Sequence, residues 1–211
     1  MLKPCLSRWK ISVLLGLSVG FGLNLLIGLI AAARGEISLH YDHFEPVMFL
    51  FLILCVAIQS GAEELAMRWF VYQRFRRYFP NSPLPAILAN SLFFMALHLL
   101  NNGISILPIL HLAVAGLMYS LLVYYFDSFW GAVIAHTGWN FCQSILLGLP
   151  NSGLVSAYSV FKLDAATAVS GLAYDPAFGI EGSVLAVVLQ ILICIALVYF
   201  GEKRKKSQAN A

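Results

Sequence analysis

Charged and amide side chains interrupt long apolar stretches of this sequence, where such residues are rare. They are Glu63, Glu64, Arg68, His98, His111, His136 and Asn140. An ionisable side chain at the centre of a membrane helix costs roughly 2.5–3.5 kcal/mol, so it is retained mainly where it faces other helices and finds partners. A carboxylate with a histidine can activate water, and imidazole or amide N–H groups can stabilise an oxyanion. The set could therefore hydrolyse an amide bond.

The spacing of these residues along an α-helix separates two kinds of carboxylate. Glu64 and Arg68 are four residues apart, so they share a helical face and can form an ion pair. Glu63 lies about 100° around the helix from Glu64 and is offered that partner less easily. We therefore interpret Glu64 and Arg68 as structural support, and Glu63 as the carboxylate that is left free for chemistry.

Four of the residues are predicted to converge at one depth in a helical bundle. They are Glu63, His98, His136 and Asn140. The prediction uses a rise of about 1.5 Å per residue, counted from the ends of the apolar stretches. His136 and Asn140 are four residues apart, so both project from one helical face. His111 enters from the opposite side, and we expect it to lie outside this layer in a structural role.

Apolar segments of about the length of a membrane helix must position this cluster. The chain of 211 residues is 60% hydrophobic and only 11% charged, which leaves too little charge to cover a soluble domain of this size. Six apolar blocks can be marked, and they are Ile11–Ala33, Val47–Phe70, Pro85–Leu100, Ile104–Phe126, Phe129–Leu149 and Val184–Phe200. We predict an all-α, polytopic transmembrane bundle with about six spans.

Basic residues gather on one side of this predicted bundle. They precede the first block and follow the second and the last, at Lys3, Arg8, Lys10, Arg74, Arg76, Arg77 and Lys203–Lys206. The opposite side holds only Arg34 and Lys162, together with six acidic residues. Positive charge favours the cytoplasmic side of a membrane, so both termini are predicted to be cytoplasmic. The basic tail is then a topology anchor, and no nucleic-acid partner is expected.

The chain is interpreted as one membrane domain of residues 1–211. A core of about 46–149, which contains the polar cluster, is followed by an external loop 150–183, a last span 184–200 and a basic cytoplasmic tail 201–211. The external loop is long for a connection in a compact domain. A lid, a re-entrant piece and a mobile loop all remain open for it.

Three motifs in this order resemble the CPBP family of intramembrane glutamic endopeptidases, which includes the CAAX prenyl proteases and relatives linked to bacteriocin immunity. The motifs are Glu63-Glu64-x-x-x-Arg68, Phe94-x-x-x-His98 and His136-x-x-x-Asn140, and the resemblance covers about residues 60–140. Each motif alone is weak, whereas all three in order are specific. Relatives often carry Phe and Gly where this chain has Met67 and Trp69, a difference in local packing that touches no proposed catalytic group.

The resemblance implies a peptidase mechanism for the cluster. By analogy, Glu63 is the general base for a water molecule and His98 helps to orient and activate that water. His136 and Asn140 donate to the oxyanion of the tetrahedral intermediate, while Glu64 and Arg68 support the site. We expect no cofactor and no metal. The substrate is a membrane-associated peptide or protein, and the location is a bacterial plasma membrane that the chain crosses several times.

Three other readings of the cluster remain open. Two histidines and a carboxylate form a known zinc ligand set, although the chain has no His-Glu-x-x-His segment. Buried glutamate and histidine also serve proton relays in transporters. A non-catalytic scaffold or immunity protein could keep the same helical framework.

Overall fold

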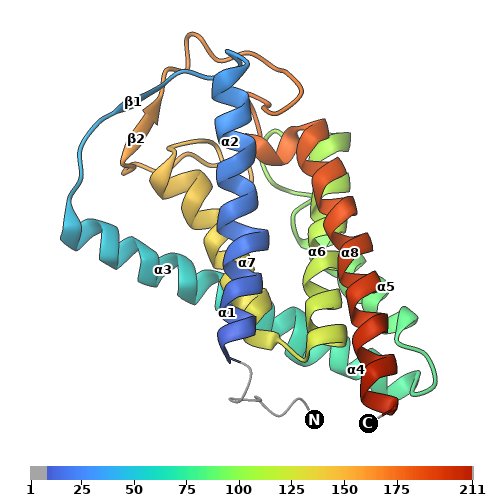
Figure 1. The fold of residues 1–211 in the computed structure, drawn as a ribbon. Coiled ribbons are helices and arrows are strands. Elements are labelled where there is room, and N and C mark those ends of the chain that lie inside the picture. Colours follow the sequence, from blue (N-terminus) through green and yellow to red (C-terminus); the bar gives the residue numbers. More distant parts are fainter. Residues whose placement is uncertain (1–8, 211) are drawn as a thin grey trace.

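A computed structural model describes residues 9–210, which form a mainly helical protein (Figure 1). Two long helical rods each contain a π-helical turn. The first rod consists of α1 (Trp9–Leu17), the π-helical turn η2 (Ser18–Gly22) and α2 (Leu23–Ala33). The second rod consists of α3 (Pro46–Glu64), the π-helical turn η3 (Leu65–Val71) and α4 (Tyr72–Tyr78). The other helical elements are α5 (Leu84–Leu97), α6 (Ile106–Phe126), α7 (Phe129–Phe141) with the π-helical turn η4 (Cys142–Leu146), the 3₁₀ turn η5 (Ile180–Gly182) and α8 (Val184–Ala209).

Each of the six predicted apolar blocks coincides with a helical segment. Among the described residues, four helices are long and apolar enough to cross a membrane: Trp9–Ala33, Pro46–Tyr78, Ile106–Phe126 and Val184–Gln208. The helix α5 has 14 residues and is about 21 Å long, shorter than a hydrocarbon core of about 30 Å. The helical class is therefore confirmed, while the count of six spans stays a prediction.

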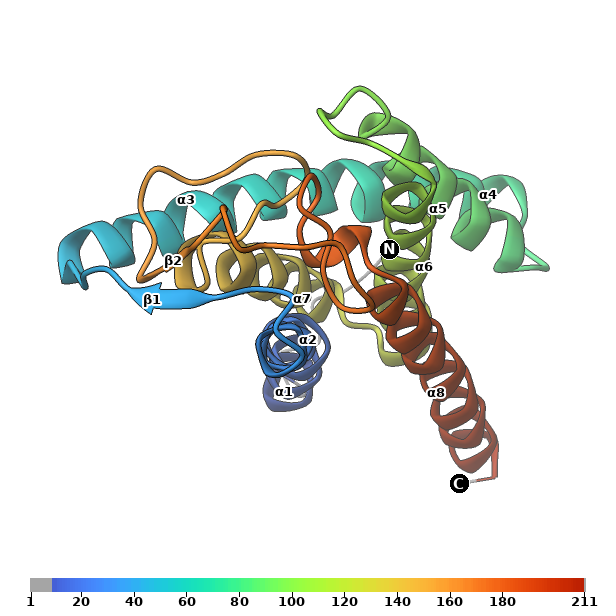
Figure 2. The same ribbon diagram turned by 90° about the horizontal axis from the view of Figure 1, so that it is seen from above.

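The helices α6 and α7 lie at the centre of the molecule. The helix α6 packs between α5 and α8, and α7 packs between α3 and the rod of α1 and α2. In Figure 2 the helix α3 lies across one side of the bundle, at a steep angle to the viewing direction along α1. Because α6 and α7 are covered on several sides, 11 of the 21 residues of α6 and 9 of the 13 residues of α7 are buried.

Glycines allow two of these contacts to be close. A Cβ atom on Gly20 would lie 2.0 Å from the carbonyl oxygen of Ala135 in α7. A Cβ atom on Gly116 of α6 would lie 3.0 Å from the Cα atom of Ser91 in α5. Neither backbone can give way cheaply, so glycine at these positions sets the spacing between helices.

The first helix of the bundle begins and the last one ends at the same end of the molecule (Figure 1). The helix α4, which carries Arg74, Arg76 and Arg77, lies toward that end as well (Figure 1). The predicted basic side thus corresponds to one end of the structure. Lys3 and Arg8 of that prediction lie outside the described residues, and the cytoplasmic orientation stays a prediction.

The segment 150–183 is folded against the connection between α2 and α3. Strand β1 (Leu39–Tyr41) pairs antiparallel with β2 (Phe161–Leu163), with Tyr41 opposite Phe161. Buried Glu36 adds a second attachment, because its carboxylate accepts hydrogen bonds from the backbone nitrogens of Leu172 (3.0 Å) and Ala173 (2.8 Å). The segment is therefore a structured layer at the opposite end from α4.

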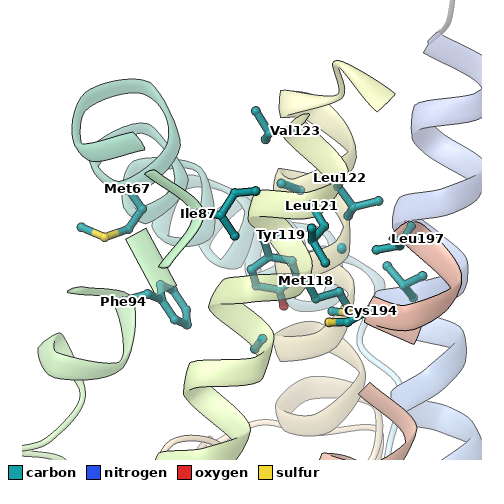
Figure 3. Packing of buried hydrophobic residues seen from close by; sticks show 14 of the residues in the cluster. Met67, Ile87, Phe94, Met118, Tyr119, Leu121, Leu122, Val123, Cys194 and Leu197 are labelled. Atoms are coloured by element: carbon teal, nitrogen blue, oxygen red, sulfur yellow. The ribbon is translucent and has the colours of Figure 1, made fainter. Parts of the chain in front are cut away.

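A hydrophobic core lies beside the polar cluster (Figure 3). Its side chains come mainly from α5, α6, α7 and α8. Those labelled are Met67, Ile87, Phe94, Met118, Tyr119, Leu121, Leu122, Val123, Cys194 and Leu197. Between membrane helices such side chains stabilise the bundle by close van der Waals packing, because lipid tails are as apolar as they are. Phe94 and Tyr119 also line the polar cavity described below, so the core forms one wall of the site.

Candidate active site

A cavity of about 720 Å³ lies between α3, α5, α6, α7 and the segment 150–183. Five predicted polar residues line it: Glu63, His98, His111, His136 and Asn140. The cavity is also lined by Gln59 and by six residues of the outer segment, among them Asn151, Ser152 and Glu181. A concave site with convergent polar groups is the usual form of a binding or catalytic pocket.

Glu63 lies in the last turn of α3 and faces two histidines. Its Oε2 atom is 3.9 Å from Nε2 of His98 and 3.9 Å from Nε2 of His136. Its Oε1 atom accepts a hydrogen bond from Nε2 of Gln59 at 3.2 Å. The distances of 3.9 Å are too long for a direct hydrogen bond. The Glu63 side chain is 28% exposed. One oxygen of Glu63 is thus directed at both imidazoles and remains accessible.

His98 follows the last residue of α5, and its backbone fixes its ring. Its Nδ1 atom is 2.8 Å from the carbonyl oxygen of Phe94. A carbonyl only accepts hydrogen bonds, so Nδ1 carries the proton in this contact. A neutral His98 then presents the lone pair of Nε2 toward Glu63. The spacing of the motif Phe94-x-x-x-His98 thus sets the tautomer of the histidine.

Glu64 and Arg68 form the predicted ion pair. Nη1 of Arg68 is 2.9 Å from Oε1 of Glu64, and both side chains are fully buried. Nη2 of Arg68 donates to the carbonyl oxygen of Gly116 at 3.2 Å. The same Oε1 of Glu64 is 3.0 Å from Nδ1 of His136. Glu64 therefore also orients a histidine of the site, a contact that the helical spacing did not predict.

Aromatic rings hold the His136 side chain from two sides. Its ring is stacked on Tyr119 with centroids 5.5 Å apart and an interplanar angle of 21°. Phe94 meets it edge-on at 5.6 Å. The guanidinium of Arg68 also lies over both rings, 4.9 Å from the centroid of Phe94 and 5.3 Å from that of Tyr119. The two rings therefore lie in contact with both the cation and the imidazole.

Asn140 lies one helical turn after His136 on α7 and lines the same cavity. Its Oδ1 atom is 3.4 Å from Nδ2 of Asn151, a long hydrogen bond. The structure thus brings together the four residues predicted to share one layer, from three different helices. Their catalytic roles stay predictions.

The outer segment 150–183 contributes a buried carboxylate to the site, which the sequence patterns did not predict. Glu181 in η5 is only 3% exposed, and its carboxylate accepts hydrogen bonds from Trp139, Asn151 and Ser152. Burial raises the pKa of Glu181 to about 7 even though these hydrogen bonds oppose the shift. Nothing in the sequence separates Glu181 from Asp175 or the other acidic residues of that segment, because the signal is a contact with α7.

The prediction that His111 lies outside the polar layer is wrong. His111 of α6 lines the same cavity, and its ring packs at 5.0 Å from the ring of Trp139. Depths counted along each helix are comparable only if the helices are parallel, whereas α3 lies at a steep angle to α1 (Figure 2). A residue of the first turns of α6 and the last turn of α3 thus line one cavity.

Within residues 9–210, no group of three or more His, Cys, Asp and Glu side chains is arranged to hold a metal ion. Glu63, His98 and His136 do lie close together, and Nε2 of each histidine is 3.9 Å from Oε2 of Glu63. The zinc alternative is therefore left to experiment.

Comparison with known proteins bears on the helical core. Residues 44–142 match the family model described as Type II CAAX prenyl endopeptidase Rce1-like. This stretch contains all three motifs on which the predicted resemblance depends. No curated protein and no solved structure matches the chain. The helices apolar enough to cross a membrane agree with the match. Residues 44–142 are therefore similar to the Rce1-like family, and this similarity supports an integral membrane protease of the CAAX type in general.

Proposed function

We propose that the chain is an intramembrane endopeptidase of the glutamic type, which hydrolyses a peptide bond in a membrane-associated protein or peptide. The observation that carries this proposal is the position of Glu63. One of its oxygens faces Nε2 of both His98 and His136 at 3.9 Å inside the cavity. A general base must lie within reach of the proton it removes, directly or through one water.

In the proposed reaction, a water molecule binds between Glu63 and His98. Glu63 removes a proton from it, and the lone pair of His98 Nε2 accepts its second hydrogen bond. The resulting hydroxide attacks the carbonyl carbon of the scissile amide and forms a tetrahedral oxyanion. Glu63 then delivers the proton to the amide nitrogen, the carbon–nitrogen bond breaks, and an acid and an amine leave.

The oxyanion is proposed to bind His136 and Asn140. His136 donates from Nδ1 to Glu64, so a second donation from Nε2 requires the imidazolium form. Oε1 of Glu64 lies 3.0 Å from Nδ1 of this ring, and Oε2 of Glu63 lies 3.9 Å from its Nε2. Asn140 adds an amide N–H from the same helical face. Donors fixed before the charge develops are among the largest contributions to such catalysis.

The test is turnover by the full chain purified in detergent. The probes are a pool of quenched fluorescent peptides and a prenylated peptide that ends in a CAAX sequence, matched to its unprenylated form. We expect turnover that survives exhaustive chelation and is abolished in Glu63→Gln. Loss of activity on chelation, restored by zinc, would replace this mechanism with the zinc alternative. No cleavage of any probe would favour a scaffold, immunity or transport role.

A second measurement tests the oxyanion donors. Asn140→Ala is expected to lower kcat by about 10²–10³, the usual loss for one such donor. The KM should change little, because the donor acts mainly when the oxyanion forms. A variant with normal kcat and a raised KM would instead make Asn140 a ground-state binding residue.

A further inference from the structure

A tight turn at the edge of the cavity has a strained backbone. Asn151 and Leu154 exchange two backbone hydrogen bonds, of 2.8 Å and 3.0 Å. The two residues between them have left-handed φ angles, 51° at Ser152 and 83° at Gly153. Glycine adopts such angles freely, whereas serine is uncommon there. The turn therefore needs support from outside at Ser152.

The Glu181 carboxylate supplies this support. Its Oε2 atom accepts hydrogen bonds from the backbone nitrogen of Ser152 at 2.7 Å and from the Ser152 hydroxyl at 3.2 Å. Its Oε1 atom accepts from Nε1 of Trp139 and from Nδ2 of Asn151, both at 3.1 Å. Four donors thus occupy one buried carboxylate. It ties the turn to α7, the helix that carries His136 and Asn140.

The same carboxylate determines which way two amides face. An ionised carboxylate only accepts hydrogen bonds, so the Asn151 atom beside Glu181 must be Nδ2. The same Nδ2 atom lies 3.4 Å from the Asn140 amide. It donates one of its two hydrogens to Glu181 and the other to Asn140. The Asn140 atom facing it must therefore be the oxygen. The Asn140 nitrogen is left for a group inside the cavity.

The geometry points to Glu181 and Asn151 as positioning residues, which orient the Asn140 amide so that its N–H groups face the substrate. The catalytic consequence rests on the proposed function, whereas the amide orientation does not. Without this chain of contacts the Asn140 amide can turn over, and its oxygen would then repel an oxyanion. The outer segment 150–183 thereby contributes to the site through Asn140.

The first test reads the Asn140 amide directly, without any substrate. The full chain is labelled with [¹⁵N]asparagine in detergent, and the Asn140 side-chain signal is identified by its loss in Asn140→Ala. Burial raises the pKa of Glu181 to about 7, so spectra are recorded near pH 8, where the carboxylate is ionised. We expect the signal to move in both Glu181→Gln and Asn151→Ala.

The matched control is Glu36→Gln. Glu36 is also buried and also accepts backbone hydrogen bonds from the segment 150–183, at Leu172 and Ala173. It does not line the cavity. Its replacement should loosen the same segment yet leave the Asn140 signal in place. An Asn140 signal unchanged in both Glu181→Gln and Asn151→Ala would overturn the inference, whatever the enzyme does. Asn151→Ala carries the test alone if Glu181→Gln does not fold.

The second test measures turnover of a peptide that the wild type cleaves. Glu181→Gln and Asn151→Ala are expected to lower kcat about tenfold with little change in KM, a part of the loss for removing the donor itself. The double variant Asn140→Ala/Glu181→Gln should be no slower than Asn140→Ala. Additive losses would show that Glu181 does not act through Asn140. A wild type without peptidase activity refutes the proposed function, and the Asn140 signal still decides the orientation.

Discussion

Glu63 and Glu64 are adjacent in the sequence but occupy different environments. Glu64 is fully buried between Arg68 and His136, whereas Glu63 keeps 28% of its side-chain exposure and faces the cavity. The separation follows from the helix, which turns successive side chains by about 100°. One carboxylate holds neighbouring groups in place, and the other is available to a water molecule.

Replacing each glutamate by glutamine should therefore have different effects. Glu63→Gln is expected to abolish turnover while the melting temperature stays near the wild-type value, because shape is kept and the base is lost. Glu64→Gln should lower stability by about 3–5 kcal/mol, the usual result of leaving a buried charge such as Arg68 without its partner. Thermal melts in detergent and a turnover assay separate the two. A stable Glu64→Gln variant with normal turnover would contradict this assignment.

Glu181 makes stability depend on pH. Its folded pKa is raised to about 7 from the ordinary 4.5, so between these values the folded protein binds more protons than the unfolded chain. The contribution to the free energy of unfolding is therefore full below about pH 4.5 and is lost as pH rises through 7. We expect melting temperatures to fall over that window, and to fall less in Glu181→Gln. Equal pH profiles for the two proteins would exclude this group as the cause.

At the scale of elements, α7 connects every part of the site. It contacts α3, α6 and the rod of α1 and α2, and it carries His136, Trp139 and Asn140. A π-helical turn follows the proposed catalytic residues on both α3 and α7, at Leu65–Val71 and Cys142–Leu146. Such turns are frequent at functional sites because they shift the helix face that follows them. The position of α7 against its neighbours should therefore control activity.

Gly20 offers a test of that position. In Gly20→Ala the new Cβ atom would lie 2.0 Å from the carbonyl oxygen of Ala135, the residue before His136. The rod and α7 must move apart, which should cost about 1–3 kcal/mol of stability and reduce turnover. The control is Gly61→Ala on α3, where a Cβ atom meets nothing within 4 Å. Similar melting temperatures and rates for both variants would show that this contact does not set the site.

At the scale of the whole molecule, the two ends differ in charge and structure. One end carries the arginines of α4 and the end of α8, and the other carries the β1–β2 pair and the segment 150–183 (Figure 1). This asymmetry agrees with the charge segregation in the sequence. It predicts a direction of insertion into a membrane, with the basic end in the cytoplasm.

Reporter fusions along the chain can establish the direction. We expect fusions near Arg77, Asp127 and Lys205 to report a cytoplasmic position, because basic residues gather on that side. Fusions near Asp42, Asn102 and Asp164 should report the external side. An external position for the fusion at Lys205 would refute the six-span arrangement with cytoplasmic termini.

The sequence by itself determined the helical class, the helical location of all six apolar blocks and the three motifs that the Rce1-like match contains. These are local properties, since hydropathy and the i, i+4 spacing depend on neighbours along the chain. The ion pair of Glu64 and Arg68 belongs with them, because both residues share one helical face.

Only the tertiary structure decided which residues meet across the bundle. The contact between Glu64 and His136 joins residues 72 positions apart, and that between Trp139 and Glu181 joins residues 42 apart. Both depend on how helices cross and on where the outer segment folds back, which no local pattern encodes. The position of His111 at the same cavity as Glu63 likewise depends on how α6 and α3 are placed relative to each other. Side-chain packing between distant segments fixed these positions, and periodicity along the chain could not.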